Sequence, residues 1–353
     1  MANSKLIRTS IMTQTKQQKA KYFQLALIGL ALLLFVTGVC IGSSQTGLSD
    51  ILKLVTGELS NTKRIIITEI RIPRSLMALA CGFSLAVAGV AMQGLFRNPL
   101  ASPSILGVNA GASLGAALVI IFGAVLFPNI SSTLQFYLLP LGAFIGASSV
   151  TLAAVRVGTI NGRTQIYLLL LAGIAIQAIA GACLALLTYL STVEQMRDMV
   201  FWSMGDLGYA SWREIWLIIA LLCLSTYKIC KNASALNLLL IGEAEAGHLG
   251  VDVAKLKKSI ILWTSLSVAV TIAFTGSIGF IGLLAPHLVR IIVGPDHRKL
   301  IISAGLTGAC LLCLADILSR SFTADVIPVG IITALAGAPL FLKLLISEKK
   351  ASL

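Results

Sequence analysis

Residues 236–252 read LNLLLIGEAEAGHLGVD, a polar insert in an otherwise apolar chain, and a basic run at 255–258 follows it. Gly242 and Gly247 are expected to break the insert into short helical pieces. Six long apolar segments precede the insert and four follow it. A bilayer requires apolar spans, but it does not require a compact loop of mixed charge in the middle of the chain. We therefore interpret 236–252 as a docking surface for a soluble partner.

The composition places the chain in a membrane. Of 353 residues, 57% are hydrophobic and 12% are charged, about half the charged fraction of a soluble domain. The apolar residues come in blocks of about 20, the length that crosses roughly 30 Å of hydrocarbon as a helix. Abundant glycine and alanine suit close packing of such helices. We predict an all-α, polytopic membrane protein with about ten transmembrane helices and both termini cytoplasmic.

The net charge of +13 comes from 27 Lys and Arg against 14 Asp and Glu. On the predicted topology most of the basic residues fall on the side of both termini, as the positive-inside rule requires. No basic stripe with interleaved aromatic residues occurs, so the expected surroundings are a lipid bilayer and no nucleic acid. The seven cysteines lie in or beside apolar segments, which is typical of packing residues.

The predicted organisation has three parts: a basic cytoplasmic tail (1–21), a membrane domain (22–346) that contains the insert, and a cytoplasmic tail (347–353). Segments 42–70 and 191–213 are expected to be external. Gly107, Gly111 and Gly115 recur every four residues and predict a packing face. The predicted spans are 22–41, 75–95, one beginning near 105, 136–155, 165–190, 214–229, 260–274, one beginning near 276, 300–318 and 326–346.

No motif for chemistry was found in the sequence. It lacks the GxxxxGK[ST] phosphate loop and the HExxH and GxSxG signatures, and its three histidines lie far apart. We expect no catalytic residue, no metal site and no cofactor in this chain. An ion-coupled secondary transporter usually carries buried carboxylates, and only Asp316, near a predicted helix end, resembles one. That class and an intramembrane enzyme are both disfavoured, so energy for transport is expected to enter from outside the chain.

Several stretches together carry a resemblance to a known family. These stretches, in chain order, are RIPR (71–74), AGVAMQGLFRNPLASPSILGVNAGASLGA (88–116), FWSMGDL (201–207), LGVD (249–252), GFIGLLAPHLVR (279–290), DHR (296–298), ADILSR (315–320) and PVGIITALAGAP (328–339). With them the chain resembles the FecCD-type permeases of ABC importers for iron-siderophore complexes, haem and cobalamin.

The resemblance implies a multi-pass protein of the bacterial inner membrane that works in an assembly. Its expected partners are a second permease subunit, in a homo- or heterodimer, two cytoplasmic ABC ATPase subunits that bind ATP and Mg²⁺, and an external substrate-binding protein. In such an assembly the insert would contact the ATPase. The residues expected at that contact are Gly242, Glu243, Ala246, Leu249 and Gly250.

Two further groups of residues follow from the resemblance. Arg71, Arg74 and Arg320 match external positions that dock the binding protein, and a guanidinium suits carboxylate capture. The alternative for each arginine is a lipid headgroup contact. The translocation path is expected along 165–190, where Gly173, Gln177 and Gly181 are its candidate lining residues.

One position departs from the family pattern. Val326 stands where a glutamate is common, and Asp325 lies one residue earlier, so the role of that acid is open. The expected ligand is an iron(III)-siderophore, with haem or cobalamin as the alternative.

Overall fold

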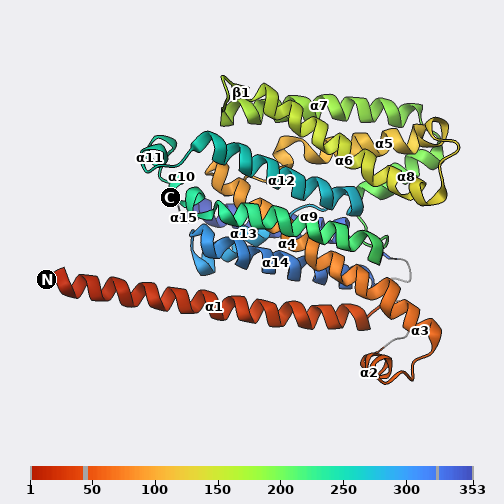
Figure 1. Cartoon of the computed structure of the whole chain (residues 1–353), viewed down its shortest axis with the longest axis horizontal. Coiled ribbons are helices and arrows are strands. Elements are labelled where there is room, and N and C mark those ends of the chain that lie inside the picture. The colour runs from red at the N-terminus through yellow and green to blue at the C-terminus, as the bar shows by residue number, and fades with distance from the viewer. Residues whose placement is uncertain (1, 43–46, 323–325, 352–353) are drawn as a thin grey trace.

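The computed structural model describes residues 2–42, 47–322 and 326–351, and nearly all of its elements are helices (Figure 1). This confirms the predicted all-α class. In chain order the elements are α1 (Ala2–Cys40), α2 (Leu48–Thr56), α3 (Asn61–Ile65), the π-helical turn η1 (Ile66–Arg71), α4 (Ile72–Phe96), the 3-10 turn η2 (Pro103–Leu106), α5 (Val108–Leu126), α6 (Ser132–Val157), β1 (Thr159–Ile160), β2 (Arg163–Thr164), α7 (Ile166–Leu190), α8 (Val193–Ser203), α9 (Trp212–Lys231), α10 (Ala233–Leu239), α11 (Glu243–His248), α12 (Val253–Thr275), α13 (Ile281–Val293), α14 (His297–Ser319) and α15 (Val329–Ala351).

Seven helices within the described ranges are long and apolar enough to cross a bilayer. This confirms a multi-pass helical membrane protein, while the count of about ten spans stays a prediction. Among the other candidates, α9 carries charged residues near both ends. The 13 residues of α13 extend only about 20 Å, less than the roughly 30 Å of hydrocarbon.

The helix that contains α4 begins earlier than expected. It runs without a break from Asn61 to Phe96, whereas the sequence predicted an external segment up to residue 70 and a span from 75. Proline lacks the N–H that a helix interior needs. In the structure η1 directly precedes α4, whose second residue is Pro73, and such a π turn accommodates a local irregularity inside a helix.

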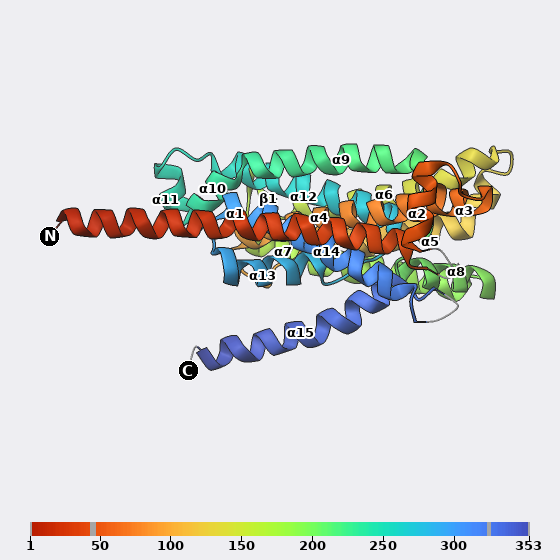
Figure 2. The ribbon, with the colours of Figure 1, turned by 90° about the horizontal axis from the view of Figure 1, so that it is seen from below.

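The two ends of the chain lie at the same end of the bundle. Figures 1 and 2 show both ends on the side that carries α10 and α11, while α2, α3 and α8 lie at the opposite side. This arrangement agrees with termini on one face of the membrane, and the cytoplasmic assignment stays a prediction. Helices α1 and α15 run through the expected domain boundaries at 21 and 346.

Helix α4 forms the centre of the bundle. It packs against α14, α12, α13 and α9, and 78% of its most apolar stretch is buried, against 17% for α1. Small residues permit this position: a Cβ atom on Gly89 would overlap the carbonyl of Gly282, and one on Gly82 would overlap that of Gly308. The backbones of α4, α13 and α14 therefore approach as closely as small-residue interfaces allow.

The predicted glycine face lies between α5 and α6. A Cβ on Gly111 would meet the carbonyl of Gly146, and one on Gly115 would meet that of Gly142. A Cβ on Gly107 would also meet α6, at the Val150 side chain, so all three glycines lie in close packing. Gly107 in addition precedes α5 with a φ of +82°, a left-handed conformation that glycine adopts at little cost.

A buried ion cluster joins two central helices. Asp316 of α14 is fully buried, and its carboxylate accepts hydrogen bonds from Arg74 Nε at 2.7 Å and Arg320 Nη2 at 2.7 Å. Asp316 was expected near a helix end, within reach of the interface or a partner. The structure instead places it between two guanidiniums, which compensate a carboxylate that water cannot solvate.

Two arginines also fasten the end of α1 to this cluster. Arg320 Nη1 donates to the carbonyls of Gly38 and Ile41, both at 3.1 Å. Arg71 Nη1 donates to the carbonyls of Val39 at 2.9 Å and Cys40 at 2.7 Å. The last carbonyls of a helix lack partners within the helix and carry partial negative charge. The arginines supply these carbonyls with hydrogen-bond donors and with a compensating positive charge.

We expect Asp316→Asn to destabilise the chain strongly, because it leaves two buried guanidiniums without their shared carboxylate. Breaking a buried pair in this way costs about 3–5 kcal/mol. The matched control is Asp252→Asn, which removes an exposed carboxylate paired with Lys255, a contact that solvent screens. Thermal unfolding of the purified chain in detergent measures both. Equal midpoints for the two variants would contradict a supporting role for Asp316.

Candidate functional site

The polar insert forms two short helices at one end of the bundle. Helix α10 ends at Leu239 and α11 begins at Glu243, and Gly242 turns the chain between them with a φ of +150°. Gly242 is thus the expected breaker, whereas Gly247 lies inside α11. We call the segment from Ala233 to Gly250 the coupling segment.

The five residues expected to contact an ATPase do not share one environment. Ala246 is fully buried and holds α11 against the bundle. Leu249 is 60% exposed although it is apolar, and Gly250 is exposed with a φ of +87° and open space around its Cβ position. A soluble protein could therefore approach the backbone at the end of α11 closely.

Glu243 is held from within the chain. The Lys257 ammonium lies 2.7 Å from its Oε2 atom and donates a second bond to the Thr164 carbonyl at 3.0 Å. The Lys257 side chain is only 7% exposed, and that of Glu243 is 39% exposed. One lysine therefore ties α11 to α12 and to the β1–β2 hairpin, whose Thr164 belongs to β2.

Sequence reasoning missed this role of Lys257, which it grouped with the basic run. A signal was present, because Ile260 and Ile261 lie three and four residues further on and are both buried. Residues at these spacings share a helix face, so the position of Lys257 on the apolar face of α12 could have been inferred. Lys255 and Lys258 are exposed. The Lys255 N–H donates to Asp252, which lowers the pKa of that carboxyl from its usual value.

A second connection joins α10 to the turn before α14. Asn237 donates from Nδ2 to Asp296 Oδ1 at 2.7 Å, and its Oδ1 accepts the His297 backbone N–H at 2.9 Å. The His297 ring is buried and faces Gly94 of α4. The coupling segment is thus attached to the bundle at both of its helices, so a displacement of the segment would be felt at α12, α14 and α4.

The three candidate docking arginines are not exposed. Arg71, Arg74 and Arg320 are only 4%, 7% and 8% exposed, and each donates to groups of this chain as described above. The sequence did not reveal this burial, because the α1 carbonyls that Arg71 and Arg320 bond and the Asp316 carboxylate that Arg74 bonds are far from them in sequence. The docking role itself stays a prediction. Arg74 Nη2 also lies 3.6 Å from Asp206, whose side chain is 38% exposed.

The three candidate path residues lie in two different environments. Gln177 Nε2 donates to the Ile105 carbonyl at 2.9 Å, and a Cβ on Gly173 would overlap that same carbonyl. Both residues therefore hold α7 against η2. Gly181 is exposed with open space around it. Val326 is 44% exposed, and Asp325 lies outside the described residues.

Comparison with known proteins gives consistent results. A model of the FecCD transport family matches residues 12–347. The hemin transport system permease protein HmuU of Yersinia pestis is 42% identical over 283 residues, which cover 80% of this chain and 83% of that protein. The vitamin B12 import system permease protein BtuC of Klebsiella pneumoniae is 36% identical over 328 residues, which cover 92% and 94%.

A solved structure shares the fold as well. An inward-facing metal-chelate type ABC transporter superposes with a TM-score of 0.82 at 31% identity, covering 93% of this chain and 99% of that one. The match of the family model spans nearly the whole chain, and the stretches that carried the resemblance lie within it. By sequence and by fold, this chain belongs to the FecCD transport family.

Proposed function

We propose that this chain is the membrane-spanning subunit of an ATP-driven importer that moves a metal chelate into the bacterial cytoplasm. The single observation that carries the proposal is the coupling segment, an exposed surface fastened to the bundle by Lys257 and Asn237. Because the sequence has no phosphate loop, ATP and Mg²⁺ bind two separate ATPase subunits. The segment lies at the end of the bundle where both chain ends lie, which the positive-inside rule makes cytoplasmic.

The opposite end of the bundle receives the ligand from an external binding protein. Three arginines and two carboxylates lie at that end: Arg74 and Arg320 pair with Asp316, Arg74 also lies 3.6 Å from the partly exposed Asp206, and Arg71 donates to the end of α1. This end of the cluster retains a net positive charge, which favours an acidic docking partner. The ligand passes between this chain and a second permease subunit.

The identity of the transported chelate is a more specific part of the proposal. The relatives named above are described as haem and vitamin B12 permeases, which favours haem first and cobalamin second. An iron(III)-siderophore is the third candidate, and no observation on the described residues selects it.

The assembled transporter tests the function directly. We expect proteoliposomes that contain the chain, its ATPase and its binding protein to take up one of the three chelates in an ATP-dependent manner. The purified chain alone should hydrolyse no ATP, because it has no site for the phosphates. Uptake driven by a proton or sodium gradient without ATP would contradict the proposal.

Leu249 tests the ATPase contact, because it is exposed and apolar and its side chain supports nothing inside the chain. Leu249→Glu should place a charge in a contact that excludes water. We expect the affinity for the ATPase to fall by about tenfold or more, or about 1.4 kcal/mol, with normal membrane insertion. The control is Lys258→Glu, a charge change at an exposed site at the start of α12. If the Leu249→Glu variant bound the ATPase as tightly as the parent, the end of α11 would not be part of the contact.

Lys257 tests whether the coupling segment transmits movement. Lys257→Met keeps the buried stem but removes both bonds, to Glu243 and to Thr164. We expect ATP hydrolysis to persist while uptake per ATP falls several-fold, because α11 can then move without α12. Lys258→Met, one residue away and exposed, should behave as the parent. Uptake and hydrolysis are measured in the same proteoliposomes, and an unchanged ratio in the Lys257 variant would refute the transmission.

A further inference from the structure

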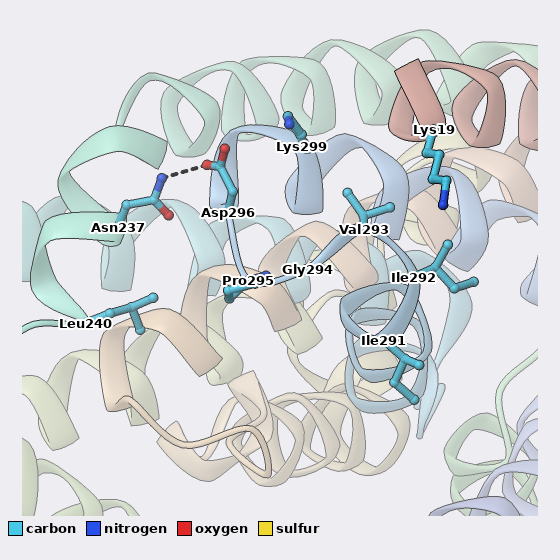
Figure 3. A pocket seen from close by; sticks show the side chains of 10 residues that line it. All are labelled: Lys19, Asn237, Leu240, Ile291, Ile292, Val293, Gly294, Pro295, Asp296 and Lys299. Atoms are coloured by element: carbon cyan, nitrogen blue, oxygen red, sulfur yellow. Dashed lines mark hydrogen bonds between the residues drawn. The ribbon is translucent and has the colours of Figure 1, made fainter. Parts of the chain in front are cut away.

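A pocket of about 510 Å³ lies beside the coupling segment. Its walls come from three parts of the chain: the first half of α1, the end of α10, and the turn that joins α13 to α14 (Figure 3). No residue expected at the ATPase contact, the docking cluster or the path lines it. Asn237 and Leu240 of the coupling segment do line it, so the pocket adjoins that segment without including the residues expected at the ATPase contact.

Basic groups dominate the charge of the pocket. Lys19 and Lys299 line it, and neither forms an ion pair with a carboxylate in the described part of the chain. The acid of the pocket, Asp296, accepts hydrogen bonds at Oδ1 from Asn237 Nδ2 and from the Arg298 N–H, so two lysines stand against one hydrogen-bonded carboxylate. An anion would be attracted here.

The other wall is apolar. Ile291 and Ile292 are 69% and 59% exposed, and Leu240 is 42% exposed. Figure 3 shows the two kinds of wall side by side: Lys299, Asp296 and Lys19 along one edge, and Leu240 and the isoleucines along the other, with Lys19 extending from α1 toward Ile292. A small soluble anion would use only the first edge. A ligand that uses both has a charged head and an apolar tail.

The level of the pocket along the membrane-spanning helices fits such a ligand. Lys19 lies at the start of the apolar stretch Gln18–Cys40, Lys299 lies in the first turn of the candidate span His297–Ser319, and the apolar helix α13 ends at Val293. Three apolar stretches thus begin or end at this level, which is where the hydrocarbon of a bilayer gives way to headgroups. Basic pockets between helices on the cytoplasmic side are known to suit anionic lipid headgroups.

We propose that this pocket binds an anionic phospholipid, with its phosphate between Lys19 and Lys299 and an acyl chain along Ile291 and Ile292. The assignment to the cytoplasmic leaflet rests on the orientation in the proposed function, but the binding itself does not. Because Asp296 also bonds Asn237 of α10, the bound headgroup lies next to one of the two attachments of the coupling segment.

Lipid retention by the full chain tests the proposal. The chain is purified from vesicles of phosphatidylcholine and phosphatidylglycerol in equal amounts, and the lipids that remain bound are weighed by native mass spectrometry. We expect the parent to retain phosphatidylglycerol in preference to phosphatidylcholine. The Lys19→Gln/Lys299→Gln double variant should lose that preference by about tenfold. Either single variant replaces it if the double variant does not insert.

The matched control is Lys255→Gln/Lys258→Gln, which removes the same charge from exposed positions at the start of α12, outside the pocket. It should retain phosphatidylglycerol as the parent does. If both double variants lost the preference for phosphatidylglycerol equally, the preference would come from the overall surface charge and not from the pocket. That result would overturn the proposal. Equal retention of the two lipids by the parent would also overturn it, as would displacement of the lipid by millimolar inorganic phosphate or by the ATPase subunits. No transport is measured, so failure here is distinct from failure of the importer assay.

Discussion

Backbone contact at glycine is the constraint on which this bundle depends. Between helices in lipid the hydrophobic effect supplies little attraction, so association relies on van der Waals contact and hydrogen bonds. Gly89 against Gly282 and Gly82 against Gly308 bring α4 within contact of α13 and α14. That proximity allows Arg74 of α4 to reach Asp316 of α14. The polar cluster at one end of the bundle thus depends on the small residues along the helices.

The charged residues buried in the bundle act mainly as fasteners. Arg71, Arg320 and Lys257 each donate to backbone carbonyls of elements distant in sequence. A backbone carbonyl is present whatever side chain a residue carries, so such bonds fix where helices end without demanding a particular partner residue. This explains how a chain with 12% charged residues can hold short helices such as α11 and irregular turns at defined places.

The fold could be predicted where a sequence signal is local. The segment 165–190 and helix α7 differ by one residue, because a long apolar run between polar residues needs no tertiary information. The helix at 61–70 was missed because the π-helical turn η1 carries the helix on into α4 just before Pro73, and residue propensities do not reveal such a turn. The burial of Arg74 and Arg320 was missed because it depends on α1 and α14, and Arg320 reaches carbonyls some 280 positions away. Gly242 could be placed as a breaker and Lys257 on the apolar face of α12, whereas the partners of Lys257, Glu243 and Thr164, required the three-dimensional structure.

The attachment of α1 has a consequence for shortened versions of the protein. With 17% of its apolar stretch buried, α1 resembles an accessory helix that could be deleted. Its last carbonyls, however, accept the hydrogen bonds of Arg71 and Arg320. A chain that starts after Cys40 would lose the carbonyls of Gly38, Val39 and Cys40, to which these two buried guanidiniums donate. Buried polar groups that lose hydrogen bonds add a desolvation cost to that of the lost helix surface. The first helix is therefore integral to the bundle, and truncation for expression has to stop before its last turn.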